Sequence, residues 1–449
     1  MKKIFGIGLN SFSRMDGIYF IPDYEMIVLE NTLEDKLLRK HARIRITRRD
    51  PVRNKNTLNV LRKAVENKWV PKNSYNIVYI DTERIEKVAK ENNFHIVGCV
   101  ADKFDIFYKI RMRAAAEKMN IPVVPGEILK TRNFSYVKVK KKYRQFVVQN
   151  SDSSGGRGTF FINSESQWKK IRHKLENEII AMKYIEADPV SISCCIIGSE
   201  VLYTKPQMQL IGLKQCTNMK FRFCGHDWAM PISNTAKKLA YDYAEKIGEH
   251  LKIQGYKGIF GLDMLRYKNT IYLSECNPRM VGTFPVLSML QHFYKEPLLM
   301  KYHVKAFLNQ KPDVSSKDMQ KRKIGSQIIL YNKQKTDVNT GNILRPGVYS
   351  QKTLEYLRPG FDLTEVHRNE FLLTGGIYDG DHVFKPDNQL LRIVAREGVS
   401  SGNGLNKKWA GIVNRVYEKM DIKTLLYKTT QTQTHRRKIS KGSLGNHMG

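Results

Sequence analysis

Three polar side chains end a run that otherwise has the pattern of a β-strand. The segment LSECNPRM, residues 273–280, carries Glu275, Asn277 and Arg279 on alternate positions. Such side chains are rarely buried unless another group pairs with them. A carboxylate and an amide supply the oxygen ligands that hard divalent cations prefer, and an arginine can hold an anion through two hydrogen bonds. This stretch therefore predicts a metal site beside an anion site.

A second carboxylate is predicted to reach the same place through a β-hairpin. Two apolar runs within residues 258–277 flank a turn near Lys268 and Asn269. A three-residue loop, 268–270, would place Asp263 opposite Glu275. Two like charges that face each other across a hairpin are destabilising, and a bound cation reverses the sign of that interaction.

We therefore predict that Asp263, Glu275 and Asn277 bind Mg²⁺, with Mn²⁺ as an alternative. Period-2 alternation places Ile271 and Leu273 on the same face as Glu275. The other interpretation is an edge hairpin whose acids are solvated by water. Cys276 should point away from its acidic neighbours, into the core.

A Ser/Gly-rich loop between two predicted strands forms the second candidate group. Residues 145–162 read QFVVQNSDSSGGRGTFFI. Small residues let backbone N–H groups approach an anion closely, and Arg157 adds positive charge. The loop is not a Walker A loop, because no Lys-Ser/Thr pair and no helix follow it. A hairpin that closes over phosphates and an ordinary Gly-rich turn both remain open.

The charge of the chain is strongly positive, at +33 over 449 residues. Residues 36–72 hold thirteen Lys and Arg against two acids, residues 138–144 form a second basic run, and a basic tail follows residue 429. Such a field attracts polyanions. A solvated surface, an acidic protein partner and a polyanionic substrate are all consistent with it. Nucleic acid is not expected, because no zinc finger, RNP motif or basic zipper is present.

The remaining composition indicates a globular cytoplasmic protein. Hydrophobic residues make up 41% of the chain, and no segment approaches the roughly 18 apolar residues that a membrane span needs. The six cysteines show neither CxxC pairs nor zinc spacing, which favours free thiols. Strands and helices alternate over the first hundred residues, which predicts an α/β layer with a parallel sheet.

The order of the two motifs carries more information than either motif alone. A Gly-rich hairpin is followed about a hundred residues later by an acid that stands twelve positions before an E-x-N-P-R run. This arrangement resembles the ATP-grasp superfamily of ATP-dependent ligases, over roughly residues 1–420, and the C-terminal part resembles that of biotin carboxylase-type members. The resemblance implies an α/β (α+β) ATP-grasp fold. Its parts are an N-terminal domain (1–104), a nucleotide-binding region (105–310) with a small lid lobe (130–190), a C-terminal α+β region (311–428) and a basic tail (429–449).

The resemblance also implies roles for matching residues. Asp263 and Glu275 match the magnesium carboxylates and Asn277 the amide ligand, while Arg279 and Arg157 match catalytic cations. The candidate nucleotide-binding residues are Lys109, Gln149, Ser153, Ser154, Gly155, Gly156, Gly158, Met182, Lys183, Ile185 and Lys205. One departure is Gln149, which stands where the family usually has a second phosphate-binding lysine. Another is the adenine hinge, where Met182 and Lys183 replace a common glutamate.

The family's reaction implies that ATP phosphorylates a substrate carboxylate and that an amine attacks the acyl phosphate. An amino acid as donor, an amine acceptor and a homodimer are expected. Residues 372–383 either wall the acceptor pocket or form a surface hairpin. Biotin carboxylase and carbamoyl phosphate synthase roles are less expected, because no biotin domain or duplicated half is visible.

Two further functions remain open. One is the loading of an amino acid onto an acidic acyl carrier protein, which the basic charge would suit. The other is a catalytically inactive protein that binds nucleotide or polyanions. Gln149 is the feature that favours this last function, and the intact acidic motif argues against it.

Overall fold

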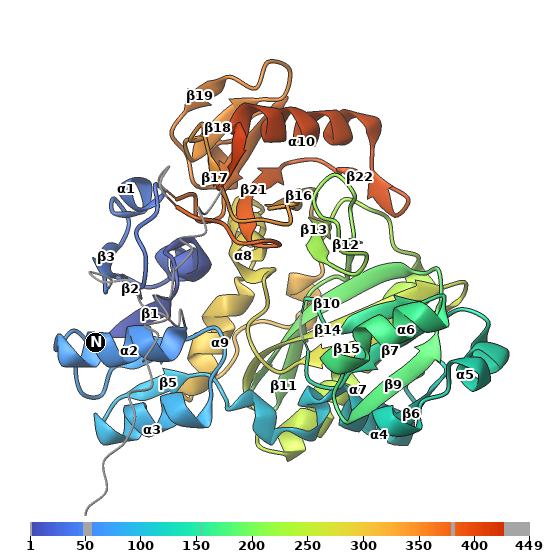
Figure 1. Cartoon of the computed structure of the whole chain (residues 1–449). Coiled ribbons are helices and arrows are strands. Elements are labelled where there is room, and N and C mark those ends of the chain that lie inside the picture. The colour runs from blue at the N-terminus through green and yellow to red at the C-terminus, as the bar shows by residue number, and fades with distance from the viewer. Residues whose placement is uncertain (1, 48–55, 154, 379–381, 426–449) are drawn as a thin grey trace, which may run out of the picture.

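The computed structural model describes residues 2–47, 56–153, 155–378 and 382–425. The predicted tail, 429–449, part of the basic run 36–72 and Ser154 lie outside these residues. Helices and sheets are mixed along the whole described chain, which confirms the α/β class (Figure 1). No helix in the described ranges has the length and apolar character needed to cross a membrane.

The N-terminal unit is a five-stranded parallel sheet in the order β3-β2-β1-β4-β5. Its elements are β1 (Ile4–Gly8), β2 (Glu25–Val28), α1 (Asp35–Leu38), β3 (Arg43–Ile46), α2 (Thr57–Glu66), β4 (Tyr75–Ile77), α3 (Glu83–Glu91) and β5 (His95–Val97). A 3-10 helix, η1 (Phe12–Tyr19), follows β1. Strand order reverses between β1 and β4, and Tyr79 and Ile80, which follow β4, line the cavity described below.

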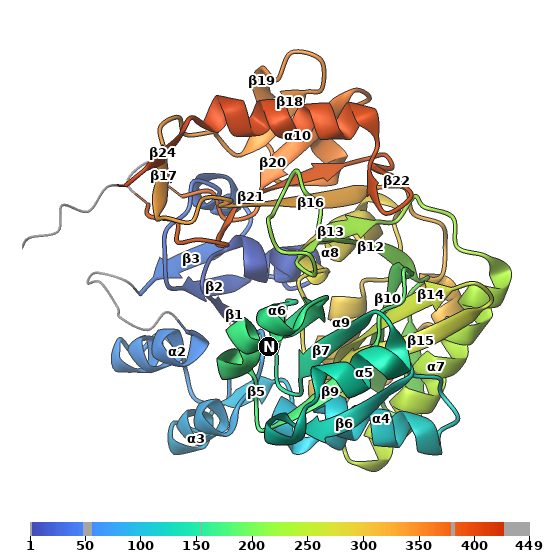
Figure 2. The same ribbon diagram turned by 45° about the vertical axis from the view of Figure 1, so that its right-hand side comes forward.

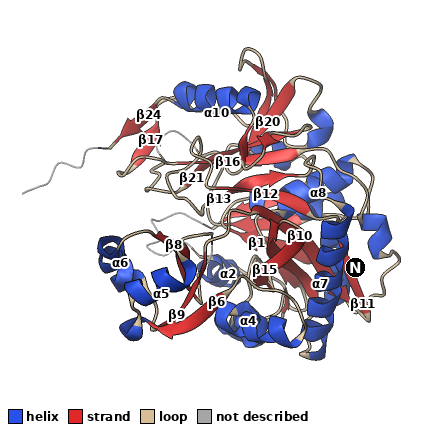
Figure 3. Cartoon of the chain, turned by 90° about the vertical axis from the view of Figure 1, so that its right-hand side faces the viewer, coloured by secondary structure: helices blue, strands red, loops and turns tan. Residues whose placement is uncertain are grey.

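The lid lobe is a four-stranded antiparallel sheet in the order β6-β9-β7-β8. Helix α4 (Lys109–Lys118) leads into β6 (Gly126–Lys130), α5 (Tyr136–Tyr143), β7 (Phe146–Asn150), β8 (Thr159–Ile162), α6 (Glu165–Ile171) and β9 (Glu178–Lys183). Phe146 and Val148 point to a core that contains Trp168 of α6. The alternate residues of β7, Val147 and Gln149, face the opposite side because successive side chains of a strand alternate. Figures 2 and 3 show α5 and α6 packed on this lobe.

An eleven-stranded sheet forms the body of the molecule, in the order β15-β14-β10-β12-β13-β16-β21-β20-β18-β19 with β11 beside β10. Its strands are β10 (Asp188–Ile197), β11 (Glu200–Tyr203), β12 (Gln207–Ile211), β13 (Phe223–Asp227), β14 (Gly258–Tyr267), β15 (Thr270–Asn277), β16 (Ser326–Tyr331), β18 (Gly347–Ser350), β19 (Tyr356–Arg358), β20 (Glu370–Thr374) and β21 (Gln389–Ala395). The β13–β16 pairing carries the sheet across the boundary predicted at residue 311.

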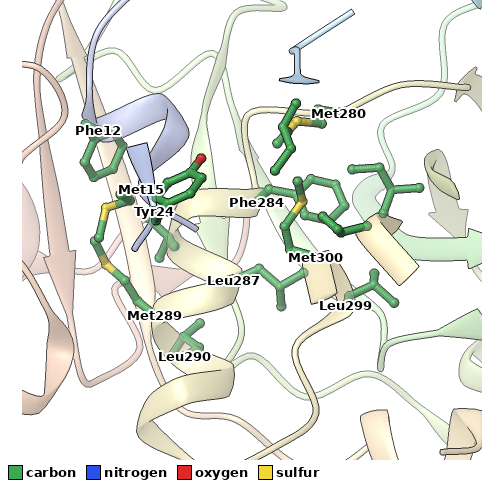
Figure 4. Packing of buried hydrophobic residues seen from close by; sticks show 14 of the residues in the cluster. Phe12, Met15, Tyr24, Met280, Phe284, Leu287, Met289, Leu290, Leu299 and Met300 are labelled. Carbon is green, nitrogen blue, oxygen red and sulfur yellow. The ribbon is translucent and has the colours of Figure 1, made fainter. Parts of the chain in front are cut away.

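Helices and two small ribbons complete the body. They are α7 (Asn234–Ile253), α8 (Phe284–Phe293), α9 (Leu299–Phe307) and α10 (Lys407–Met420), with the ribbons β17 (Val338–Thr340)–β24 (Ile422–Thr424) and β22 (Ser400–Ser401)–β23 (Gly404–Leu405). The core joins the N-terminal unit to α8 and α9: Figure 4 shows Met15 and Tyr24 beside Phe284 and Met289, with Met280 at the edge. This packing holds the segment that follows β15 against the N-terminal unit.

Candidate active site

A cavity of about 820 Å³ lies between the inner face of the lid sheet and the body sheet. The predicted site residues at its wall are Lys109, Gln149, Ser153, Gly155, Gly156, Met182, Lys183, Ile185, Asp263, Glu275, Asn277 and Arg279. Segments as far as 170 residues apart in the sequence therefore meet around one space.

The β14–β15 hairpin places Asp263 opposite Glu275, but through a different turn from the one predicted. The turn has two residues, because Tyr267 pairs with Thr270 and Lys268 adopts a φ of 54°. A bulge at Ser274 then restores the expected pairing at the site, since an inserted residue shifts the register by one position.

The same bulge changes which side chains share a face. Ile271, Leu273 and Cys276 are buried in one apolar cluster, whereas Glu275 and Asn277 line the cavity. The prediction that Ile271 and Leu273 share a face with Glu275 is therefore wrong, because the inserted residue inverts the alternation between them. The burial of Cys276 is confirmed.

The two facing carboxylates are electrostatically strained. Burial and the neighbouring charge of Glu275 raise the pKa of Asp263 to about 7. Gln209 donates to Asp263 Oδ1 at 2.7 Å, and Lys109 Nζ lies 3.5 Å from Glu275 Oε1. A divalent cation between the carboxylates would relieve this repulsion.

Asn277 makes different contacts from those of a metal ligand. Its Oδ1 accepts from Arg279 Nη2 at 2.8 Å, and its Nδ2 donates to Asp263 Oδ2 at 3.2 Å. Its amide must turn before the oxygen can reach a cation near the carboxylates. Among the described residues, no group of three or more His, Cys, Asp and Glu side chains could hold a metal. The facing pair Asp263 and Glu275 fits Mg²⁺, which uses one or two carboxylates and completes its shell with water and phosphate oxygens.

The Gly-rich loop lies against the loop that joins β12 to β13. Gly156 has a φ of 78°, and a Cβ there would lie 1.9 Å from the Phe221 carbonyl oxygen. Only glycine fits this approach. Lys109 Nζ donates to the Ser153 carbonyl oxygen, which ties the start of α4 to the loop. Gly158 is buried against Ser153, while Arg157 is exposed and lies outside the cavity wall.

The strand before the loop and the predicted hinge both face the cavity. Gln149 Nε2 donates to Thr159 Oγ1 at 3.1 Å, so its amide nitrogen has a partner within the lid. The backbone N–H groups of Lys183 and Tyr184 donate to Pro125 and Gln145, which fixes the path of the hinge. Glu186, which the sequence reasoning did not name, also lines the cavity.

Two of the weaker predictions fall elsewhere. Lys205 lies outside the cavity wall, where burial and then Lys237 lower its pKa, so the structure does not bring it to the site. In the predicted acceptor segment, Thr374 and Ile377 lie outside the cavity wall and bind the buried carboxylate of Glu34. The described part of 372–383 therefore packs on the N-terminal unit.

Three residues at the cavity were missed or left among many alternatives. Lys220 Nζ lies 3.7 Å from the ring centroid of Phe161 and 4.3 Å from that of Tyr184, and so links the body to the lid and hinge. His226 is buried; burial lowers its pKa to about 3, and Gln327 Nε2 lies 2.9 Å from its Nδ1. Tyr79 comes from the distant N-terminal unit, and no local motif marks it.

Comparison with known proteins places this site in a family. Residues 100–283 match the model of the ATP-grasp domain. The carbamoyl phosphate synthase large chain of Clostridium botulinum is 22% identical over 263 residues, which are 51% of this chain and 24% of that protein. The arginine-specific large chain of Geobacillus stearothermophilus is 22% identical over 209 residues, 45% of this chain and 19% of its own. The match thus spans about a quarter or less of these curated relatives.

Solved structures resemble this chain over more of its length than the curated relatives do. The biotin carboxylase domain of 2-oxoglutarate carboxylase from Hydrogenobacter thermophilus has a TM-score of 0.61 at 14% identity and covers 88% of this chain and 86% of its own. An N5-carboxyaminoimidazole ribonucleotide synthetase has a TM-score of 0.56 at 16% identity, with 93% and 96% covered. Residues 100–283 therefore match an ATP-grasp domain, and the described chain shares its overall fold with these solved structures.

Proposed function

We propose that the chain is an ATP-dependent ligase that joins a carboxylate to an amine through an acyl phosphate and releases ADP and phosphate. The observation that carries the proposal is the pairing of Asp263 with Glu275 at the wall of a cavity that also contains Lys109, Arg279 and the Gly-rich loop. Phosphoryl transfer needs positioning and charge neutralisation more than covalent help from the protein.

Each part of the wall has a role in this reaction. The hinge at Met182–Ile185 would hold adenine, and the loop around Gly155 would cover the phosphates and exclude water. Mg²⁺, held by Asp263 and Glu275, would offset charge on the phosphate oxygens. Lys109 would neutralise the phosphates, and Arg279 would hold the substrate carboxylate and then the acyl phosphate.

The neighbouring structures support the choice of nucleotide and metal. The 2-oxoglutarate carboxylase domain is a dimer in complex with MgADP, ADP and bicarbonate, and a carboxyaminoimidazole ribonucleotide synthase from Aspergillus clavatus is complexed with ATP. For this chain we infer ATP with Mg²⁺, and a homodimer as its assembly. The six free cysteines in the described part of the chain agree with a cytoplasmic location.

Loading of an acidic carrier protein remains a second candidate because of the basic N-terminal unit. The exposed basic side chains of its described part include Lys36, Arg39, Lys40, Arg43 and Arg62. A surface of this sign would speed encounter with an acidic partner. The acceptor would then be a thiol rather than an amine, while the activation of the carboxylate would be unchanged.

Hydroxylamine trapping tests the proposal. The chain is incubated with Mg²⁺-ATP, hydroxylamine and one carboxylic acid at a time, and hydroxamate and ADP are measured. We expect one class of acid, amino acids first, to give both products together. ADP binding without a hydroxamate from any acid in a broad panel would instead support a protein that only binds nucleotide.

A further inference from the structure

Three arginine side chains meet at one short segment directly after the metal-binding strand. Arg14 Nη1 lies 2.9 Å from Met280 Sδ, and Arg279 Nη1 donates to the Met280 carbonyl oxygen at 2.9 Å. Arg392 Nη1 donates to the Gly282 carbonyl oxygen at 3.1 Å. The three come from η1, from the end of β15 and from β21, so each part of the fold outside the lid contributes one cation.

No carboxylate of the described residues lies within ion-pair distance of these cations. Within the described ranges, none of the three guanidinium groups has a carboxylate oxygen within 4.0 Å. Arg14 is 3% exposed and Arg392 is 7% exposed, and the Nε of each lacks a hydrogen-bond partner. Asp16 acts on Arg14 from a distance, but its Oδ1 accepts from Ser288 at 2.5 Å.

Burial of a cation without a partner opposes folding, and the lowered pKa values of Arg14 and Arg392 have the same cause. Burial lowers the pKa of Arg14, and burial lowers that of Arg392 to about 10. A buried ion without a partner is costly, and proteins normally compensate it with an opposite charge. Asp16 offsets part of the charge of Arg14, whereas no described carboxylate lies within ion-pair distance of Arg392, so the segment keeps a local excess of positive charge.

The same segment forms one end of the cavity. Arg279 and Gly282 line it together with Tyr79, whose hydroxyl accepts from Arg279 Nη1 at 2.9 Å. The three cations contact residues 280–282 of this wall, Arg14 and Arg279 at Met280 and Arg392 at Gly282. The four acids that line the cavity are Asp152, Glu186, Asp263 and Glu275, which belong to the lid, the hinge and the metal site.

We propose that the substrate sharing the cavity with the nucleotide carries an anionic group besides its reacting carboxylate, either a phosphate ester or a second carboxylate. This group lies against Tyr79 and residues 280–282, next to the reacting carboxylate on Arg279, and Arg14 and Arg392 are positioning residues that supply charge from behind the wall. The inference rests on the proposed function and names the substrate class for the same site.

Calorimetric titration tests this with inorganic phosphate and, separately, with malonate. The full chain is first saturated with Mg²⁺ and β,γ-methylene-ATP, so that the nucleotide phosphates fill their own positions. We expect one anion per chain, and roughly tenfold weaker binding when one nearby cation is removed in Arg14→Met or Arg392→Met. Binding of phosphate alone indicates a phosphate ester, and binding of malonate alone indicates a dicarboxylate.

Arg396→Met is the matched control, because Arg396 follows β21, is exposed, and donates to Val366 rather than to residues 279–282. Nucleotide affinity should stay within twofold in all three variants. A purely structural role predicts the opposite pattern, with lost stability and unchanged anion affinity. If Arg392→Met does not fold, Arg14→Met and Tyr79→Phe are used in its place. The anion should then raise the melting temperature of the parent more than that of either variant.

Absence of anion binding by the parent, or equal affinity in the arginine variants and Arg396→Met, overturns the inference. The two proposals fail separately. Anion binding without hydroxamate from any acid leaves the anion site and removes the ligase. Efficient hydroxamate formation from a monocarboxylate, without anion binding, leaves the ligase and removes the anion site.

Discussion

Replacing Glu275 by Gln should abolish Mg²⁺-dependent turnover while making the metal-free protein more stable. The substitution keeps the shape of the side chain and its place opposite Asp263, but removes one of the two like charges. Lys109, which lies 3.5 Å from Glu275, keeps the attraction of Asp263 as its counter-charge. The loss of a metal-binding carboxylate should lower activity, and the loss of the repulsion should raise stability.

The size of each effect follows from the geometry. The pKa of Asp263 lies at about 7, with burial as the main cause and Glu275 as the second. Since burial is the larger cause, the repulsion accounts for the smaller part of the free energy that this pKa shift represents. Opposite charges 4 Å apart near a protein surface attract by about 4 kcal/mol. A loss of that order predicts at least a hundredfold fall in turnover.

The assay combines turnover against Mg²⁺ concentration with chemical denaturation in the presence of a chelator. We expect the Glu275→Gln variant to unfold at higher denaturant concentration than the parent, and to need far more Mg²⁺. Glu245→Gln, on α7 beside Tyr203, is a control that removes a carboxylate elsewhere. Normal turnover at ordinary Mg²⁺ would refute the metal assignment, and a loss of stability would refute the account of the repulsion.

Three other perturbations probe separate parts of the site. Gly156→Ala should raise the KM for ATP at least tenfold in steady-state kinetics, because its Cβ would overlap the loop beyond β12; Gly198→Ala, at a positive φ in open space, should not, and equal effects would contradict the proposed packing. Gln149→Lys should lower the KM for ATP by adding charge beside the phosphates, and an unchanged KM would show that this position does not face them. Burial raises the pKa of Glu34 to about 7, so its ionisation costs about 3 kcal/mol as pH rises from 4.5 to 7. Chemical denaturation between pH 5 and 8 should therefore show that the free energy of unfolding of the parent falls as pH rises, and that of Glu34→Gln does not. An equal fall in both proteins would contradict this assignment.

The sequence was most informative where chemistry and periodicity coincide. Asp263 and Glu275 were placed opposite each other by assuming a three-residue loop, and the pairing holds because a two-residue turn and the bulge at Ser274 together give the same offset. The stripe on α7 that includes Ala240, Tyr243 and Ile247 is buried as its 3.6-residue period predicts. These features depend on neighbours close in sequence, which a single chain reveals.

Features that depend on distant contacts could not be predicted. The bulge at Ser274 has no glycine to mark it, and its effect is visible only in the pairing of β14 with β15. Tyr79 and Arg392 reach the site region through the packing of separate units, and nothing in their local sequence indicates this. Lys205 was expected at the phosphates because it is a base in the right segment, but its strand connection carries it to a cluster of other bases instead.

Transfer of ¹⁸O from substrate to phosphate tests the central claim most directly. A carboxylate labelled with ¹⁸O, chosen from the hydroxamate panel, is converted with Mg²⁺-ATP and the amine acceptor, and the products are examined by mass spectrometry. An acyl phosphate requires one ¹⁸O atom in the released phosphate and ADP as the nucleotide product. Label in AMP, or unlabelled phosphate alongside amide product, would contradict the mechanism that we assign to this site.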